Sequence, residues 1–152
     1  MPSFATKRNV GFTAAQMYGV VADIERYPEF LPLCTGLRVL SRSQKADAGG
    51  EELTARMSVG YKAIAESFTT RVVLKPVQPA IDVNYLDGPF KRLVNHWKFH
   101  DTGERRSEID FYIDYEFRSA FLAVVMGSMF EQAFRRFSQA FEERARKIYG
   151  PG

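Results

Sequence analysis

Residues 108–117 read EIDFYIDYEF, and residues 119–149 read SAFLAVVMGSMFEQAFRRFSQAFEERARKIY. In the first stretch, apolar side chains at odd positions alternate with polar or exposed ones at even positions, which is typical of an antiparallel strand with one solvated face. The second stretch predicts an amphipathic helix roughly 45 Å long. Its inner side would carry apolar residues at steps of three and four, which are Leu122, Met126, Met129, Ala133, Phe137, Ala140 and Phe141. Such a helix must cover apolar surface, so we expect it to lie on the inner face of the sheet to which residues 108–117 belong.

The residues before this pair alternate in the same way. The pattern predicts strands over 37–43, 53–61, 64–74, 81–85 and 93–99. We expect turns at 46–50, at Gly60-Tyr61 and at Asp87-Gly88-Pro89, since glycine, proline and aspartate are the residues that turns favour.

The N-terminal part of the chain predicts three further elements. Residues 3–11 alternate as a first strand. Thr13 is a suitable N-cap for a helix that runs to about Asp23. The segment 27–34 carries two prolines among bulky apolar residues, so we expect at most one short helix followed by a turn.

This order of elements predicts the α+β fold class and, within it, a helix-grip architecture. One domain would span residues 1–152, because a chain of this length is typical of a single domain. A curved antiparallel sheet of about six or seven strands would wrap around the long C-terminal helix, with two short helices after the first strand. A curved sheet does not contact a straight helix everywhere, so we expect a cavity between them.

The chain contains 13 phenylalanines, and aromatic residues make up 14% of it. Large apolar side chains suit either a thick core or the wall of an apolar pocket, and periodicity does not separate the two. Ordinary core packing therefore remains an alternative for each candidate. The candidate cavity residues are Met57, Phe68, Thr70, Asn95, Trp97, Phe111, Tyr115, Leu122, Met126, Met129 and Ala133, and Phe30, Leu31 and Leu33 would form its lip.

Catalytic and metal-binding patterns do not emerge from the sequence. His96 and His100 fall on the outward side of one strand, too far apart to share a metal ion, and we predict no metal site and no catalytic residue. The alternating carboxylates of residues 108–116 are interpreted as a solvated face. Among the few inward polar residues, Thr70 and Asn95 could each bind a ligand carbonyl, although a partner within the protein is the more ordinary role.

Charge and cysteine content constrain the surroundings of the protein. The formal net charge of +3 is compatible with an anionic membrane surface or with RNA and demands neither. Cys34 is the only cysteine, which excludes an intrachain disulfide and favours a reducing compartment. No stretch is apolar over 18 residues, and the N-terminus shows no signal or transit peptide, so we expect a cytoplasmic protein.

Several motifs together resemble one known family. They are Asp23 with Tyr27-Pro28 and Phe30-Leu31-Pro32 before Cys34, then Phe68-Thr69-Thr70-Arg71, then Asp87-Gly88-Pro89-Phe90-Lys91 with Leu93, then Trp97-Lys98-Phe99, and finally Tyr115-Glu116-Phe117. In order and spacing they resemble the coenzyme Q-binding protein family of the START-like, polyketide-cyclase-like superfamily. The bacterial branch of that family includes the ribosome-association toxin A.

The resemblance implies a helix-grip fold, an apolar cavity and no defined catalytic residues. It implies a non-enzymatic protein that binds ubiquinone or a related polyprenyl quinone, or another lipid, in support of respiratory electron transport, with no cofactor beyond that ligand. The alternative is a toxin-like protein that binds the large ribosomal subunit and blocks subunit association, for which Lys91, Arg92, Arg105 and Arg106 are the candidate basic residues. A third hypothesis is an enzyme of the aromatase/cyclase type. We expect a bacterial protein that does not bind DNA, with transient contact at the inner-membrane surface left open.

Overall fold

The computed structural model describes residues 3–44, 50–61 and 64–151. The strands are β1 (Ser3–Val10), β2 (Cys34–Gln44), β3 (Glu51–Tyr61), β4 (Ile64–Lys75), β5 (Ala80–Asp87), β6 (Phe90–Gly103) and β7 (Arg106–Phe117), and the helices are α1 (Ala14–Ala22), the 3-10 helix η1 (Ile24–Glu29) and α2 (Ala120–Tyr149). The described strands form one seven-stranded sheet in the order β1-β7-β6-β5-β4-β3-β2, with every neighbouring pair antiparallel. The predicted helix-grip fold is confirmed.

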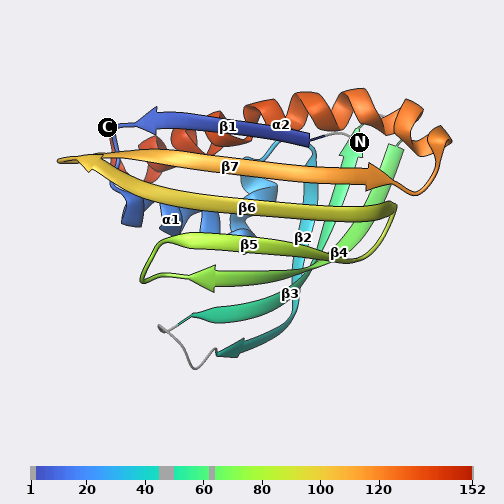
Figure 1. The fold of residues 1–152 in the computed structure, drawn as a ribbon, viewed down its shortest axis with the longest axis horizontal. Coiled ribbons are helices and arrows are strands. Elements are labelled where there is room, and N and C mark those ends of the chain that lie inside the picture. The colour runs from blue at the N-terminus through green and yellow to red at the C-terminus, as the bar shows by residue number, and fades with distance from the viewer. Residues whose placement is uncertain (1–2, 45–49, 62–63, 152) are drawn as a thin grey trace.

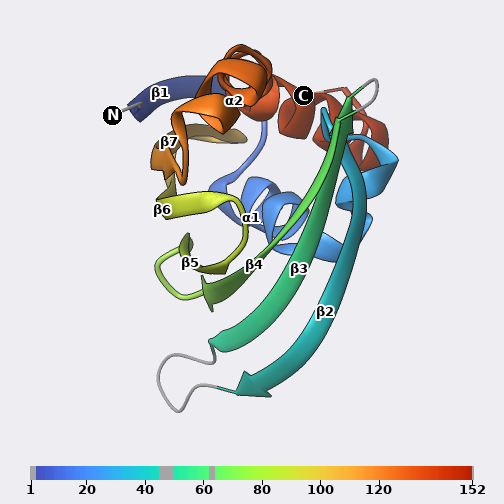
Figure 2. The same ribbon diagram turned by 90° about the vertical axis from the view of Figure 1, so that its right-hand side faces the viewer.

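The sheet is strongly curved. Figure 1 shows β1, β7, β6 and β5 running side by side with α2 along one edge of the molecule, and Figure 2 shows β2, β3 and β4 turning away from them to form a concave surface. The pairing register shifts between Val39 and Ser41 on β2 and between Thr69 and Thr70 on β4. Such irregularities bend strands and increase their twist, so they help the sheet to close around the helices.

Capping hydrogen bonds mark the start of α1 and both ends of α2. Thr13 accepts a hydrogen bond from the backbone N–H of Gln16 at 3.1 Å, and the Gln16 side chain accepts one from the N–H of Thr13 at 2.9 Å, which completes a capping box. Ser119 Oγ caps α2 by accepting from the N–H of Leu122. At the other end Gly150 adopts φ +89° and donates its N–H to the carbonyl of Arg146.

The stripe that the long helix buries overlaps the predicted one only in part, since Met126, Ala133 and Phe141 are buried as expected. Leu122, Met129, Phe137 and Ala140 were expected on its buried face, but each is only half-buried. The buried residues of α2 are Met126, Phe130, Ala133, Phe134, Ser138, Phe141 and Ala145. Phe111 of β7 is only 1% exposed, as the alternation predicts. The helix position was therefore predicted correctly, whereas its rotation was wrong by part of a turn.

One expected turn, at 46–50, lies outside the described residues except for Gly50. The reversal expected at Gly60-Tyr61 is wrong by position, because both residues still belong to β3, which ends at Tyr61. The turn at Asp87-Gly88-Pro89 is confirmed between β5 and β6.

Candidate ligand-binding cavity

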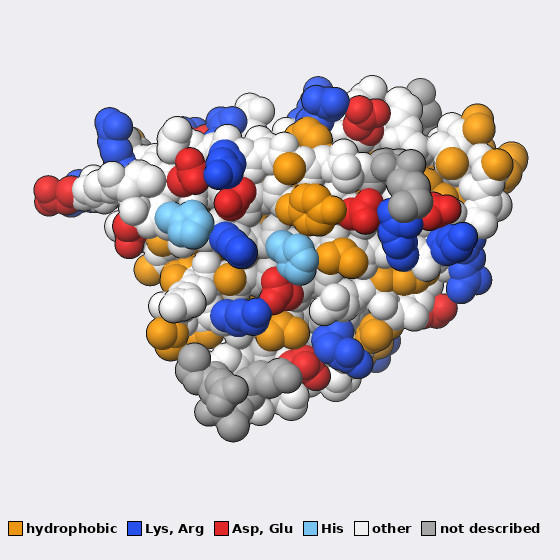
Figure 3. All heavy atoms as spheres, in the orientation of Figure 1, with side chains coloured by type: hydrophobic (Ala, Val, Ile, Leu, Met, Phe, Trp, Pro, Cys, Tyr) orange, Lys and Arg blue, Asp and Glu red, His pale blue; other side chains and the backbone are white. Residues whose placement is uncertain are grey.

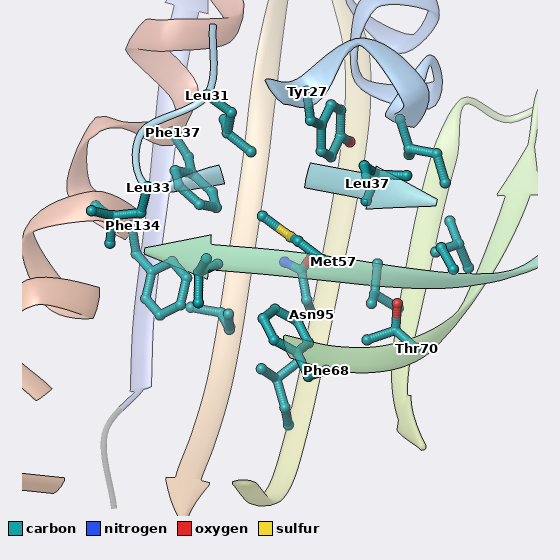
Figure 4. Close-up of a pocket in the computed structure, with 18 of the residues that line it drawn as sticks. Tyr27, Leu31, Leu33, Leu37, Met57, Phe68, Thr70, Asn95, Phe134 and Phe137 are labelled. Carbon is teal, nitrogen blue, oxygen red and sulfur yellow. The ribbon is translucent and has the colours of Figure 1, made fainter. Parts of the chain in front are cut away.

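A cavity of about 90 Å³ lies between the concave face of the sheet and α2. Figure 4 shows side chains from β2, β3, β4 and β6, from α2 and from the segment after η1 pointing into this space. The lining consists of Ile24, Tyr27, Leu31, Pro32, Leu33, Leu37, Ala55, Met57, Val59, Phe68, Thr70, Val72, Ile81, Val83, Leu93, Asn95, Trp97, Ile113, Phe130, Ala133, Phe134, Phe137 and Phe141. No ionisable group other than the Tyr27 phenol is among these lining residues, so the site offers apolar contact.

Asn95 is engaged within the protein. Its Nδ2 donates to the backbone carbonyl of Tyr112 at 2.9 Å, and its Oδ1 accepts from Nε1 of Trp97 at 3.1 Å. The buried amide therefore ties β6 to β7 and fixes the indole ring in the cavity wall. A buried polar group with partners of this kind contributes to structure, so the expectation that Asn95 binds a ligand carbonyl is not favoured by this geometry.

Thr70 presents a hydroxyl of a different kind. The residue is 6% exposed, lies on β4 and lines the cavity. Within the described residues the hydroxyl of Thr70 makes no hydrogen bond. The hydroxyl of Tyr27, which also lines the cavity, donates to the carbonyl of Val21. Enclosure in the protein raises the pKa of Tyr27, so its hydroxyl stays protonated. Thr70 is thus the hydroxyl in this wall that is free to meet a ligand.

Eight of the fourteen sequence candidates line the cavity. They are Met57, Phe68, Thr70, Asn95, Trp97 and Ala133 together with the lip residues Leu31 and Leu33. In Figure 4 Met57 projects from β3 into the centre of the space, and Leu31 and Leu33 lie on the segment that covers it.

The other candidates lie elsewhere. Phe111 and Tyr115 are buried but stand behind the wall, where Phe111 packs on Trp97 with 4.5 Å between ring centroids and Tyr115 packs on Phe134 at 5.2 Å. Met126 is buried in the core outside the cavity. Phe30 packs on Phe141, 5.3 Å between ring centroids, and does not reach the cavity.

The predictions for Leu122 and Met129 are also wrong, because they assumed a different rotation of α2 about its axis. Both are half-buried, and neither lines the cavity. A charge introduced at Met129 would therefore not occupy the cavity.

The candidate site omitted the phenylalanines of α2. Phe130, Phe134, Phe137 and Phe141 line the cavity, and their spacing of four, three and four residues is a helical stripe in its own right. Phe137 and Phe141 were expected on the inner side of the helix, but Phe130 and Phe134 were not, although the sequence contains the whole stripe.

An open groove adjoins the cavity. It has a volume of about 600 Å³ and is lined by Pro32, Leu33, Ile64, Val125, Ser128, Met129, Gln132, Ala133 and Arg136. Pro32, Leu33 and Ala133 line both spaces, so they form the partition between them. Leu33 adopts φ +68°, a left-handed conformation that is strained for a leucine. Its carbonyl accepts a hydrogen bond from the N–H of Gly60 at 3.0 Å.

The outer face of the sheet carries the charged residues. Both histidines are visible there in Figure 3, and Nδ1 of His96 lies 2.7 Å from a carboxylate oxygen of Asp82. Burial alone would raise the pKa of Asp82, but hydrogen bonds from Lys75 and His96 lower it overall. Over residues 3–44, 50–61 and 64–151 no three His, Cys, Asp or Glu side chains gather in a way that could hold a metal ion.

The basic residues expected to meet a ribosome are partly neutralised. Arg92 donates to Glu116 at 2.8 Å and to Asp114 at 3.1 Å, and Lys91 lies 3.9 Å from Glu116. Arg105 occupies the turn between β6 and β7 at φ +59°. Lys91 and Arg92 therefore have acidic neighbours within the sheet, which weakens them as candidate phosphate contacts. None of the described helices is long and apolar enough to cross a bilayer.

Comparison with known proteins agrees with this geometry. The family model described as polyketide cyclase / dehydrase and lipid transport matches residues 10–142. The chain is 36% identical over 149 residues to the ribosome association toxin RatA of Escherichia coli (strain K12), covering 98% of this chain and 90% of RatA. It is 26% identical over 150 residues to the mitochondrial coenzyme Q-binding protein COQ10 homolog B of Xenopus laevis, covering 97% of this chain and 59% of that protein.

Solved structures share the fold. An 18 kDa protein from Caulobacter crescentus is 31% identical with a TM-score of 0.78, and the match covers 99% of both chains. The Zhui aromatase/cyclase from Streptomyces sp. R1128 superposes with a TM-score of 0.77 at 18% identity, covering 97% of this chain and 95% of that one. The chain therefore belongs to the polyketide cyclase/dehydrase and lipid transport family of START-like proteins, among the relatives that include RatA and the coenzyme Q-binding proteins.

Proposed function

We propose that this protein binds a lipophilic ligand, a polyprenyl quinone such as ubiquinone, in the cavity between the sheet and α2, without catalysing a reaction, and that it thereby supports respiratory electron transport. The observation that carries the proposal is the character of the cavity: it is almost wholly apolar, and among the described residues that line it Thr70 alone has a hydroxyl without a hydrogen-bond partner. An apolar pocket with few convergent polar groups is the usual form of a site for such ligands. The relationship to a coenzyme Q-binding protein supports this choice of ligand.

The size of the cavity implies that binding opens it. About 90 Å³ is well below the roughly 300–1,000 Å³ of ordinary ligand pockets. The groove of about 600 Å³ lies directly beyond Pro32, Leu33 and Ala133. We infer that the ligand displaces this partition and occupies both spaces, with a quinone carbonyl accepting a hydrogen bond from Thr70 and the prenyl chain extending toward the groove. Relief of the strained backbone at Leu33 would favour such a movement.

Organic extraction of the purified protein followed by mass spectrometry tests the ligand class directly. Titration with a short-chain ubiquinone supplies the affinity, because Trp97 is the only tryptophan and lines the cavity, so a bound quinone should quench its fluorescence. Ala133→Leu, which fills the partition with three more carbon atoms, should weaken binding at least about tenfold, since overfilling a packed site costs about 1–3 kcal/mol.

Ala123→Leu makes the same substitution at an exposed position of the same helix and should leave binding unchanged. A folded Ala133→Leu protein that binds quinone as the unchanged protein does would show that the ligand does not use this cavity. Extracts that hold no lipid, together with unquenched Trp97 fluorescence at saturating quinone, would exclude the proposed function.

Binding to the large ribosomal subunit is the second candidate, and one surface favours it. Arg38 of β2 and Arg56 of β3 are exposed and stand directly opposite each other in the sheet. Like charges in this relation repel, and within the described part of the chain neither has an ion-pair partner. Two unpaired guanidinium groups side by side are suited to phosphate, and the relatives named ribosome association toxin give this surface a candidate partner.

A salt series separates the two candidates. Phosphate contacts release counterions, so ribosome affinity should fall about tenfold to a thousandfold between ~50 and ~200 mM salt, whereas burial of a prenyl chain is not screened. Arg38→Glu with Arg56→Glu should abolish ribosome binding and leave quinone binding intact. Lys7→Glu with Lys98→Glu is the control, because it changes the net charge equally at another part of the outer face, and it should retain ribosome binding. Salt-sensitive ribosome binding that only the arginine pair removes, without quinone binding, would reverse the order of the two candidates.

The aromatase/cyclase hypothesis is supported by the fold and by the description of the family model, but not by the chemistry of the cavity. The similarity to the Streptomyces enzyme stands at 18% identity and concerns architecture. General acid–base catalysis needs a titratable group near the reacting atoms. Among the lining residues only the Tyr27 phenol is titratable, and it donates its proton to the carbonyl of Val21 and has a raised pKa.

A further inference from the structure

The first two turns of α2 expose an unusual amount of apolar surface. Phe121 is 73% exposed and Val124 is 82% exposed, and Val125 beside them is 37% exposed. Figure 3 shows hydrophobic side chains gathered at the right-hand edge of the molecule, where α2 begins in Figure 1. Scattered apolar residues are normal on a protein surface, but large neighbouring ones mark a contact site.

One basic residue adjoins this apolar tip, and a second lies further along the groove. Arg118 precedes Phe121 by three residues and is exposed, and Arg136 is exposed on the groove that Val125 also lines. Neither arginine forms an ion pair within residues 3–44, 50–61 and 64–151. No acidic residue lies in the first turn of α2, and the nearest acid along the helix, Glu131, is bound to Arg135 at 3.0 Å.

The tip is also continuous with the groove that leads to the cavity. Val125 belongs to the exposed tip and lines the groove, and Ser128 and Met129 follow one turn further along the helix. The groove in turn meets the cavity at Leu33 and Ala133. A groove of mixed polar and apolar lining therefore extends from the tip, along α2, to the partition of the cavity.

From this arrangement we propose that the N-terminal tip of α2, made of Phe121, Val124 and Val125, with Arg118 beside it and Arg136 further along the groove, docks onto an anionic lipid bilayer. Apolar side chains enter the boundary between headgroups and acyl chains, and the guanidinium groups meet lipid phosphates, as in other peripheral helices that combine apolar and basic residues. Docking in this position places the groove at the membrane surface. The proposal concerns the outside of the protein and does not depend on what the cavity binds.

Flotation with vesicles tests the proposal. The protein should bind vesicles of phosphatidylcholine mixed with phosphatidylglycerol and bind pure phosphatidylcholine vesicles more weakly. Phe121→Ser with Val124→Ser should lower the affinity about tenfold or more, because burial of one such side chain is worth that much. Arg118→Gln with Arg136→Gln should lower affinity for the mixed vesicles about fivefold or more and reduce its salt dependence.

Val77→Ser with Ile148→Ser is the matched control. These residues are 69% and 53% exposed and lie between β4 and β5 and near the end of α2, away from the tip. All substituted positions are exposed, so unchanged melting temperatures should accompany every result. The proposal is overturned if the unchanged protein does not bind mixed vesicles, or if the tip and control variants bind equally. It is also overturned if sedimentation shows a dimer that Phe121→Ser with Val124→Ser dissociates while vesicle binding stays unaffected, since the tip would then serve a second copy of the chain.

Discussion

Thr70→Val should stabilise the protein and weaken quinone binding at the same time. Thr70 is 6% exposed and lines the cavity, and its hydroxyl has no hydrogen-bond partner among the described residues. Valine has the same shape and the same preference for strands, so the substitution removes one polar atom and changes little else. If the Thr70 hydroxyl had a structural role, its removal would destabilise the protein. If it serves a ligand, its removal should stabilise the protein.

The size of each effect follows from the surroundings of the hydroxyl. Burial of a hydroxyl without a partner costs about 1–3 kcal/mol, and the nearly apolar lining disfavours a water molecule that could satisfy it. We therefore expect the free energy of unfolding to rise by about 1 kcal/mol, which is about 2–4 °C in melting temperature for a domain of this size. Loss of a hydrogen bond to a quinone carbonyl should weaken binding about twofold to tenfold.

Urea denaturation and quenching of Trp97 fluorescence by a short-chain ubiquinone measure the two effects. Thr69→Val is the control, because Thr69 is the preceding residue of β4, lies on the opposite face and is half-buried; its effect on stability should stay within about 0.5 kcal/mol. A Thr70→Val protein that is less stable than the original would show that the hydroxyl has a structural partner. Unchanged quinone affinity would show that Thr70 does not contact the ligand.

The remaining predictions concern backbone and ionisation. Gly88→Ala should lower the free energy of unfolding in urea by about 2 kcal/mol or more, because Gly88 has φ +143° and a Cβ there would lie 2.5 Å from the Cβ of Phe68. Gly127→Ala should instead raise it by about 0.5–1 kcal/mol, because a Cβ at this position in α2 meets nothing within 4 Å. Burial raises the pKa of the Cys34 thiol from 9.0 to about 11. Between these pH values the unfolded chain loses a proton that the folded protein keeps, so stability should fall by up to about 2–3 kcal/mol as pH rises through this window. Urea midpoints measured across this pH window should fall less for Cys34→Ala than for the original protein. An equal fall would show that the Cys34 thiol does not cause the loss of stability.

The sequence predicted which face of each strand points inward, but not which inward residues meet the cavity. Trp97 and Phe111 are register partners on β6 and β7 and both face inward, yet only Trp97 lines the cavity. The difference depends on where a straight helix touches a curved sheet. That contact is a property of the assembled layers, which periodicity within one strand does not encode.

The pairing of Arg92 was hidden for a related reason. Arg92 stands opposite Glu116 because the register of β6 and β7 shifts between Phe90 and Arg92. A shift of one residue changes which charges meet across a sheet, and nothing in the local sequence announces it. The rotation of α2 differs from these cases, since the phenylalanine stripe from Phe130 to Phe141 was present in the sequence and could have corrected it.

The two candidate functions use opposite faces of one strand pair, and this makes their tests independent. Leu37 and Met57 are register partners that line the cavity, and the next pair, Arg38 and Arg56, points outward. Because successive side chains of a strand point to opposite faces, substitution of Arg38 and Arg56 by glutamate leaves the cavity lining chemically unchanged. Substitution of Ala133, which lies on the helix across the cavity, leaves the outer face with the two arginines unchanged. Loss of ribosome binding in the arginine variant therefore says nothing against a bound lipid, and each activity must be decided by its own measurement.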